Sequence, residues 1–264
     1  MPRVTVEIED TIAYVRLTRA DKHNGVDLQM IDELNAAGRS LKGNKKIRAV
    51  ILHGEGPSFC AGLDVKSVLS KPARAAFAFL ALFKPTANRF QNMCLVWREL
   101  SVPVIAAIHG NCFGAGLQLA LGADIRLCTP DAKLSVMEAK WGLIPDMAGT
   151  VLLRDVVSKD VALDLTFSAR IVSGQEAAAL GLVTRVETDP LGAARELVEE
   201  IRTRSPDAVA AAKHLFGEAW GASEHGALAA ERRWQRRMFV SKNQRIATAR
   251  NAGQGDKPYA TRQW

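Results

Sequence analysis

The chain has 264 residues, of which 48% are hydrophobic and 24% are charged, and it carries a net charge of +7. This balance indicates a folded globular protein, long enough for one large domain or one domain with an appendage. The longest apolar runs are far shorter than the roughly 20 residues that span a bilayer, and the N-terminal residues lack the apolar core of a signal peptide. We therefore expect a cytoplasmic protein with no membrane partner.

The positive charge favours an anionic partner, which can be nucleic acid, a membrane surface or a ligand that carries phosphates. Much of the charge lies in the C-terminal third, where helical spacing favours a solvated helix face. No aromatic RNA-binding motif or zinc finger accompanies it, so nucleic acid is a disfavoured partner. The four cysteines lie far apart among apolar or small residues, which is typical of buried thiols and predicts neither a metal site nor a disulfide framework.

The first half of the chain alternates predicted strands with helices. Apolar and polar residues alternate over 4–18 around a turn at 9–10, which predicts a β-hairpin. Asp27 is a suitable N-cap for an amphipathic helix that continues to Leu41. Buried strands are predicted over 49–52, 104–108 and 125–128. Strands separated by helical stretches predict an α/β fold with parallel pairing.

From Ser158 onward the pattern is almost wholly helical. Helices are predicted over 161–167, 175–180, 190–204, 206–220 and 224–244. We divide the chain into a core that carries the site, residues 1–200, and a helical C-terminal region, residues 201–264.

Two glycine-containing loops follow buried strands, one over 54–64 and the other over 110–116, before a helix predicted over 117–121. Ligands of open α/β sheets bind at the carboxyl ends of strands, so these loops form the candidate site. Neither loop has the third glycine of a dinucleotide fingerprint, and the chain has no phosphate-binding Gly-Lys-Ser/Thr sequence. Small residues there let a ligand carbonyl approach free backbone N–H groups.

Five motifs occur in a fixed order. They are Phe59-Cys-Ala-Gly-Leu-Asp-Val65, Pro103-Val-Ile-Ala-Ala-Ile-His-Gly-Asn-Cys-Phe-Gly-Ala-Gly-Leu-Gln-Leu-Ala-Leu-Gly-Ala-Asp124, Gly142-Leu-Ile-Pro145 with Gly149-Thr150, Ser173-Gly-Gln-Glu-Ala177, and Gly181-Leu-Val183. Through them the chain, from about Val4 to Trp220, resembles the crotonase superfamily, also called the enoyl-CoA hydratase/isomerase family.

This resemblance implies a crotonase (ClpP-like) spiral of parallel β-sheet and helices with a helical C-terminal trimerisation region, assembled as a homotrimer or a dimer of trimers. It implies an acyl-coenzyme A (CoA) thioester substrate, and no separate cofactor. The family's oxyanion hole corresponds to the backbone N–H groups of Leu63 and Ala115. The positions that correspond to substrate or CoA contacts are Lys22, His23, Ala61, Gly62, Asp64 and Gly114.

The resemblance also identifies the candidate proton-transfer groups. Family hydratases use two glutamates, and here the first position is Gln118, which cannot exchange a proton, whereas the second is Glu138. Asp146 stands where hydratases commonly have glycine. The pair of Glu138 and Asp146 resembles dienoyl-CoA isomerases, which implies a shift of a double bond in an enoyl- or dienoyl-CoA. Both carboxyl groups need a partly apolar pocket to raise their pKa.

Other interpretations stay open. Enoyl-CoA hydration is the main alternative, and an aryl-CoA dehalogenase or hydrolase, a non-catalytic acyl-CoA binder and an RNA binder are further ones. Glu138 can be a surface glutamate, and Asp146 can cap the following helix.

The segment 69–90 corresponds to the family's variable acyl-pocket segment. Its bulky residues, together with Trp97, suggest an apolar lining, although trimer contacts or core positions explain them equally well; they are Phe77, Phe79, Leu80 and Phe83. The family's C-terminal basic signal is reduced to Lys257-Pro258.

Overall fold

The computed structural model describes residues 1–64, 80–83 and 85–264. A six-stranded sheet has the order β1-β2-β3-β4-β6-β9, and a three-stranded sheet has the order β5-β7-β8. The strands of the large sheet are β1 Val4–Glu9, β2 Ile12–Leu17, β3 Ala49–Gly54, β4 Val104–Ile108, β6 Ile125–Cys128 and β9 Arg185–Val186. Those of the small sheet are β5 Asn111–Phe113, β7 Lys133–Ser135 and β8 Val172–Ser173.

Strand pairing confirms the predicted α/β fold with parallel pairing. Only β1 and β2 are antiparallel in the large sheet, and the neighbours from β2 to β9 all run parallel. The hairpin turn is at Asp10 and Thr11, one residue later than predicted, because Glu9 still pairs with Ile12. Both turn residues adopt positive φ, as a two-residue hairpin turn requires.

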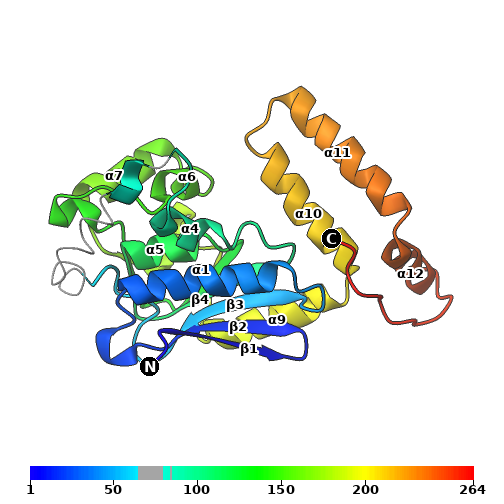
Figure 1. Ribbon diagram of the computed structural model, residues 1–264, viewed down its shortest axis with the longest axis horizontal. Helices are drawn as coiled ribbons and strands as arrows, with labels where there is room; N and C mark the ends of the chain where they lie inside the picture. The colour runs from blue at the N-terminus through cyan, green and yellow to red at the C-terminus, as the bar shows by residue number, and fades with distance from the viewer. Residues whose placement is uncertain (65–79, 84) are drawn as a thin grey trace.

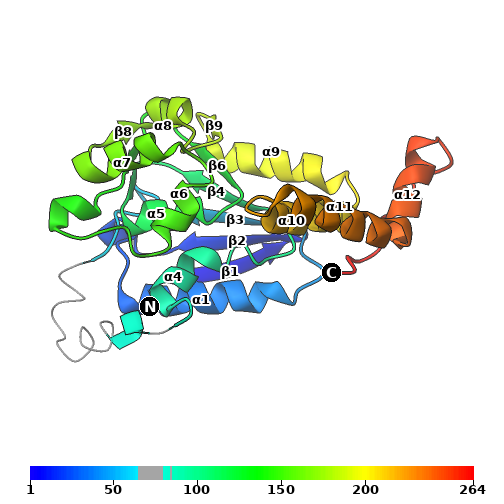
Figure 2. The same ribbon diagram turned by 90° about the horizontal axis from the view of Figure 1, so that it is seen from above.

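The large sheet lies between helices on both faces (Figure 2). Alternate strand residues, such as Val50 and Leu52, face the main core beneath α1 Leu28–Lys42, α4 Arg89–Leu95 and α5 Ala115–Leu121. The intervening residues, such as Ile51 and Ile105, pack against α9 Pro190–Arg202. The period of two along a strand therefore explains why β3 and β4 are apolar throughout.

The remaining helices confirm the helical second half of the chain. They are α6 Gly149–Leu153, α7 Lys159–Ser168, α8 Gly174–Leu180, α10 Pro206–Ala219, α11 Glu224–Phe239 and α12 Lys242–Asn251. The single helix predicted over 224–244 is wrong. The Ser241 hydroxyl accepts hydrogen bonds from the N–H groups of Asn243 and Gln244, so it caps a new helix and separates α11 from α12.

The helices α10, α11 and α12 stand at one end of the molecule, beyond the ends of the strands of the large sheet (Figure 1). The Nζ of Lys213 anchors α10 to the core by donating to the carbonyl oxygens of Trp97 and Val102 and to Asp124 Oδ2. The division into regions at residue 200 stays a prediction. None of the described helices is both long enough and apolar enough to cross a bilayer, and the cytoplasmic location stays a prediction.

Candidate active site

The two predicted loops lie side by side because backbone hydrogen bonds join them. Cys60 donates to the carbonyl oxygen of Asn111 at 2.9 Å, and Phe113 donates back to that of Cys60 at 3.0 Å. The segment 110–116 is less irregular than predicted, since it contains β5 and the helix α5 begins at Ala115 rather than Leu117. A tight turn at Gly114 makes this direct passage from strand to helix possible.

Two glycines permit the close approach of these segments. Gly62 has a φ of +92°, and a Cβ there would lie 2.9 Å from the carbonyl oxygen of Phe113. Gly114 has a φ of +48°, and a Cβ there would lie 3.0 Å from Oε1 of Glu138. Both backbone conformations strain any residue with a side chain. The two positions therefore need glycine for conformation as well as for space.

The N–H groups of Leu63 and Ala115 donate no hydrogen bond within the part of the chain that the structure describes. The peptide that carries the Leu63 N–H is nevertheless fixed, because Val26 donates to the carbonyl oxygen of Gly62 at 2.7 Å. Asp64 in turn donates to the carbonyl oxygen of Val26 at 2.9 Å. Leu63 and Ala115 border one cavity of about 130 Å³. It is lined by Ala61, Gly62, Leu63, Phe113, Gly114, Ala115, Met137, Glu138, Trp141, Leu143, Asp146 and Met147.

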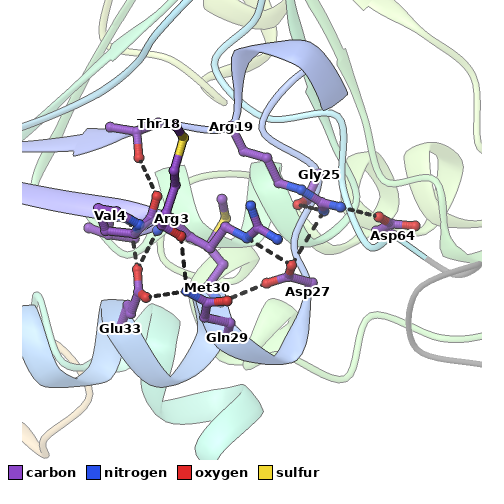
Figure 3. A network of polar contacts seen from close by, with 12 residues as sticks. Arg3, Val4, Thr18, Arg19, Gly25, Asp27, Gln29, Met30, Glu33 and Asp64 are labelled. Atoms are coloured by element: carbon purple, nitrogen blue, oxygen red, sulfur yellow. Dashed lines mark hydrogen bonds and ion pairs between the residues drawn. The ribbon is translucent and has the colours of Figure 1, made fainter. Parts of the chain in front are cut away.

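A buried ion-pair network supports the Leu63 side of the cavity (Figure 3). The guanidinium of Arg19, which is 8% exposed, contacts Asp64 Oδ2 at 2.8 Å and donates to the carbonyl oxygen of Gly25 at 2.8 Å. Asp27 lies 3.7 Å from the same guanidinium and caps α1 by accepting from the N–H of Met30. Sequence reasoning missed Arg19, although its place two residues after β2 and its positive charge, opposite in sign to that of Asp64, are visible in the sequence.

Glu138 is the first residue of the short 3-10 helix η3, Glu138–Trp141. Its Oε1 accepts a hydrogen bond of 2.7 Å from Nε2 of Gln118, whereas its Oε2 is buried with no hydrogen-bond partner among the described residues. Burial raises the pKa of Glu138, and the nearby charge of Asp146 raises it further, while the bond from Gln118 acts in the opposite direction. Glu138 is thus no ordinary surface glutamate.

Asp146 lies in the turn before α6 and is exposed, yet the walls of the cavity raise its pKa through desolvation. It does not cap the following helix, because the N-cap of α6 is Ala148 and no side-chain bond caps it. The structure therefore brings the two predicted carboxylates to the same cavity as the free N–H groups. Their roles in a reaction stay predictions.

Gln118 connects these two carboxylate-bearing segments. The residue lies on α5 and is 2% exposed. Its Nε2 donates to Glu138, and its Oε1 accepts a 2.9 Å bond from the N–H of Met147, the residue after Asp146. The sequence identifies Gln118 as an altered acid position, but not as a bridge.

The predicted CoA contacts divide into two groups. Ala61, Gly62 and Gly114 line the cavity, whereas Lys22, His23 and Asp64 are not among its described lining residues. His23 still borders the loop, because its Nδ1 lies 2.9 Å from Ser58 Oγ and its carbonyl oxygen accepts from the N–H of Ala61. The contacts with CoA themselves stay predictions.

The apolar residues of the cavity were missed in part. Phe77 and Phe79 lie outside the described residues, and Leu80 and Phe83 are exposed. Trp97 belongs to the core, where its Nε1 donates to the carbonyl oxygen of Met93. The described cavity wall comes instead from apolar residues within the motifs or between them, namely Phe113, Met137, Trp141, Leu143 and Met147.

The four cysteines are all buried, as predicted, and none forms a disulfide. Within residues 1–64, 80–83 and 85–264, no three His, Cys, Asp or Glu side chains form a group that could hold a metal ion.

Comparison with known proteins gives one consistent result. Residues 7–259 match the family model described as Enoyl-CoA hydratase/isomerase. Mouse mitochondrial methylglutaconyl-CoA hydratase is 36% identical over 176 residues, which cover 66% of this chain and 54% of the relative. Mouse mitochondrial Delta(3,5)-Delta(2,4)-dienoyl-CoA isomerase is 34% identical over 210 residues, which cover 76% and 64%. The match thus spans about half the length of the methylglutaconyl-CoA hydratases.

Solved structures resemble the chain over almost its whole length. The enoyl-CoA hydratase of Bacillus anthracis has a TM-score of 0.89 and 26% identity, with 97% of this chain and 98% of that chain covered. An enoyl-CoA hydratase of Mycobacterium smegmatis has a TM-score of 0.88 and 25% identity, with 98% and 99% covered.

Proposed function

Because the chain belongs to the enoyl-CoA hydratase/isomerase family and has the crotonase fold, we propose that it shifts a carbon-carbon double bond in an enoyl- or dienoyl-CoA thioester. One observation carries this proposal. Two carboxylates with raised pKa, Glu138 and Asp146, border the same cavity as the two free N–H groups of Leu63 and Ala115.

In the proposed reaction the thioester oxygen accepts hydrogen bonds from the N–H groups of Leu63 and Ala115. Glu138 removes a proton from the α carbon of a β,γ-unsaturated thioester, and the electron pair of that C–H bond delocalises onto the thioester oxygen. The double bond forms between the α and β carbons as Asp146 delivers a proton to the γ carbon. A proton then passes from Glu138 to Asp146, so no atom is gained or lost.

The electrostatics of the cavity suit this proton transfer. A carboxyl group with its ordinary pKa is a weak base at neutral pH, and burial of Glu138 makes it a stronger one. The two N–H groups offset the negative charge that develops on the thioester oxygen, and each such donor contributes roughly 3 kcal/mol in other enzymes. Glu138 is therefore suited to accept the proton, and the two N–H groups are suited to stabilise the negative charge on the thioester oxygen.

Hydration of an enoyl-CoA is the second candidate, favoured by the relatives and solved structures that are named hydratases. In that reaction Asp146 would have to activate water, because Gln118 cannot exchange a proton.

Incubation with enoyl- and dienoyl-CoA thioesters in deuterated water separates the two reactions. Double-bond shift gives a product of unchanged composition, apart from deuterium, with a changed ultraviolet spectrum. Hydration adds the mass of one water. Rapid water addition without double-bond migration would overturn the isomerase proposal in favour of a hydratase.

We also propose a homotrimer or a dimer of trimers. The side chains of Phe216, Trp220, Phe239 and Val240 on or beside α10 and α11 are 59%, 67%, 68% and 72% exposed. Large apolar side chains exposed on a pair of helices are typical of subunit contacts. Native mass spectrometry tests the assembly, and a monomer at micromolar concentration would contradict it.

A further inference from the structure

We infer that Gln118 is a positioning residue that holds the carboxylate of Glu138, the proposed base, by donating a hydrogen bond to its Oε1. This inference rests on the proposed function for its reaction, but the contacts of Gln118 with Glu138 and Met147 do not depend on that reaction.

The backbone N–H of Met147 fixes the orientation of the amide. An N–H group can only donate, so the Gln118 atom 2.9 Å away must be the carbonyl oxygen Oε1. The NH₂ group then necessarily faces Glu138, whose Oε1 lies 2.7 Å from Nε2. Gln118 is therefore an obligatory donor to the carboxylate, which a glutamate at the same position could not be when ionised.

Glycines enclose this arrangement from two sides. A Cβ at Gly149 would lie 2.7 Å from Gln118 Oε1, and a Cβ at Gly114 would lie 3.0 Å from Glu138 Oε1. A side chain at either glycine would therefore collide with the amide or with the carboxylate, so both glycines leave room for the contact between the buried Gln118 and Glu138. Oε1 of Glu138 is thus engaged, whereas its buried Oε2 has no partner in the described protein.

The same contacts also affect the pKa of Glu138. A donated hydrogen bond favours the ionised carboxylate, so Gln118 opposes the rise in the Glu138 pKa that burial causes. Among the described residues, the charge of Asp146 raises the pKa of Glu138, and the charge of Glu138 in turn raises the pKa of the buried Cys94 thiol. Burial keeps the pKa of Cys94 well above its ordinary value, so that thiol stays neutral. Gln118 therefore keeps Glu138 available as a base at neutral pH.

The first test compares the pH dependence of kcat/KM in the wild type, Gln118→Met and Gln118→Glu. Methionine has a similar volume but donates nothing, so the acidic limb of the profile should move to higher pH by about one unit. Glutamate adds a like charge next to Glu138 and should move the limb further. At the plateau we expect kcat to fall roughly tenfold or more, with KM within about twofold. A purely structural role would lower activity equally at every pH and leave the limb in place, which would overturn the inference.

The second test needs no turnover. Carbon-13 NMR of glutamate side chains, with Glu138→Gln to assign the signal, gives the titration of Glu138 in the wild type and in Gln118→Met. An upward shift of that titration in the variant supports the inference even if no substrate is converted, in which case only the proposed function fails. An unchanged titration refutes the role of Gln118 whatever reaction the enzyme performs. Thermal unfolding by circular dichroism confirms that both variants are folded.

Discussion

The two halves of the candidate site are built in different ways. The N–H pair of Leu63 and Ala115 is carried by backbone that neighbouring strands and loops fix through main-chain hydrogen bonds. The carboxylate pair is carried by a single turn of 3-10 helix and an exposed turn, and one side-chain amide joins them. The first half depends on the sheet, and the second depends on a few replaceable side chains.

This difference indicates which half of the site can change its chemistry by substitution. Backbone donors keep their position under most substitutions, so the half of the site proposed to hold the thioester oxygen tolerates most side-chain changes. Carboxylates at Glu138 and Asp146 can be exchanged one at a time without disturbing the sheet. We therefore expect substitutions in the carboxylate half to change the reaction, and substitutions in the N–H half to weaken every reaction together.

The largest effect should come from the carboxylate half. Glu138→Gln removes the proposed base while keeping the shape of the side chain, and kcat/KM should fall about 10³-fold. The measurement is the rate of double-bond shift together with deuterium exchange at the α carbon. Glu196→Gln, an exposed position on α9, is the matched control and should retain full activity. Undiminished exchange in Glu138→Gln would show that another group is the base.

The next largest effect should come from the N–H half. Gly62→Ala places a Cβ 2.9 Å from the carbonyl oxygen of Phe113 at a φ of +92°, so the Leu63 N–H must move. We expect kcat to fall about 10²-fold, which corresponds to the loss of one donor. Gly253→Ala has a similar φ of +70° with nothing within 4 Å, and it should leave kcat unchanged. Equal activity of the two variants would separate the loop geometry from catalysis.

Asp146→Asn should have a smaller effect than loss of Glu138, because Asp146 is more exposed and water can partly replace it. A fall in kcat/KM of about 10- to 100-fold is expected. The exposed Asp131→Asn provides the control. A larger loss than in Glu138→Gln, measured in the same assay, would reverse the roles assigned to the two carboxylates.

Asp64→Asn tests the support of the N–H half from outside the cavity. The amide cannot form the charged contact with Arg19, but the main-chain bonds with Val26 remain. We therefore expect only about a tenfold fall in kcat, and a loss of about 1–2 kcal/mol in the free energy of unfolding. Urea unfolding and steady-state kinetics measure both, with the exposed Asp21→Asn as control. A kcat equal to that of the control would remove the network from the catalytic argument.

The smallest effect concerns stability. The folded state raises the pKa of Glu138 above its ordinary 4.5, so the folded protein binds that proton more tightly than the unfolded chain. The wild type therefore loses stability as the pH rises through this range, and Glu138→Gln avoids that loss. Urea unfolding between about pH 4 and pH 8 should show the advantage of the variant growing with pH. An advantage that shrinks as the pH rises would contradict the raised pKa.

Sequence reasoning identified the backbone half of the site better than its surroundings. The hairpin, the strands β3, β4 and β6 and the cap at Asp27 followed from local pattern. The two carboxylates that border one cavity were implied by the family resemblance, and the short strands β5, β7, β8 and β9 were not predicted. The separation of α11 from α12 at Ser241 could not be predicted from the sequence. Tertiary contacts of the buried serine, and not the local apolar pattern, determine where the helix ends. The bridge of Gln118 to Met147 was equally invisible, since it joins residues that only the fold brings together.

The position of α9 in the sequence also affects how the chain folds during its synthesis. All described residues of the cavity lie between Ala61 and Met147, yet one face of β3 and β4 packs against α9, which begins only at Pro190. A nascent chain thus carries the complete set of described site residues while Ile51 and Ile105 still face water. This apolar face of the sheet is covered by a helix that has no part in the cavity, and the face stays exposed until that helix leaves the ribosome.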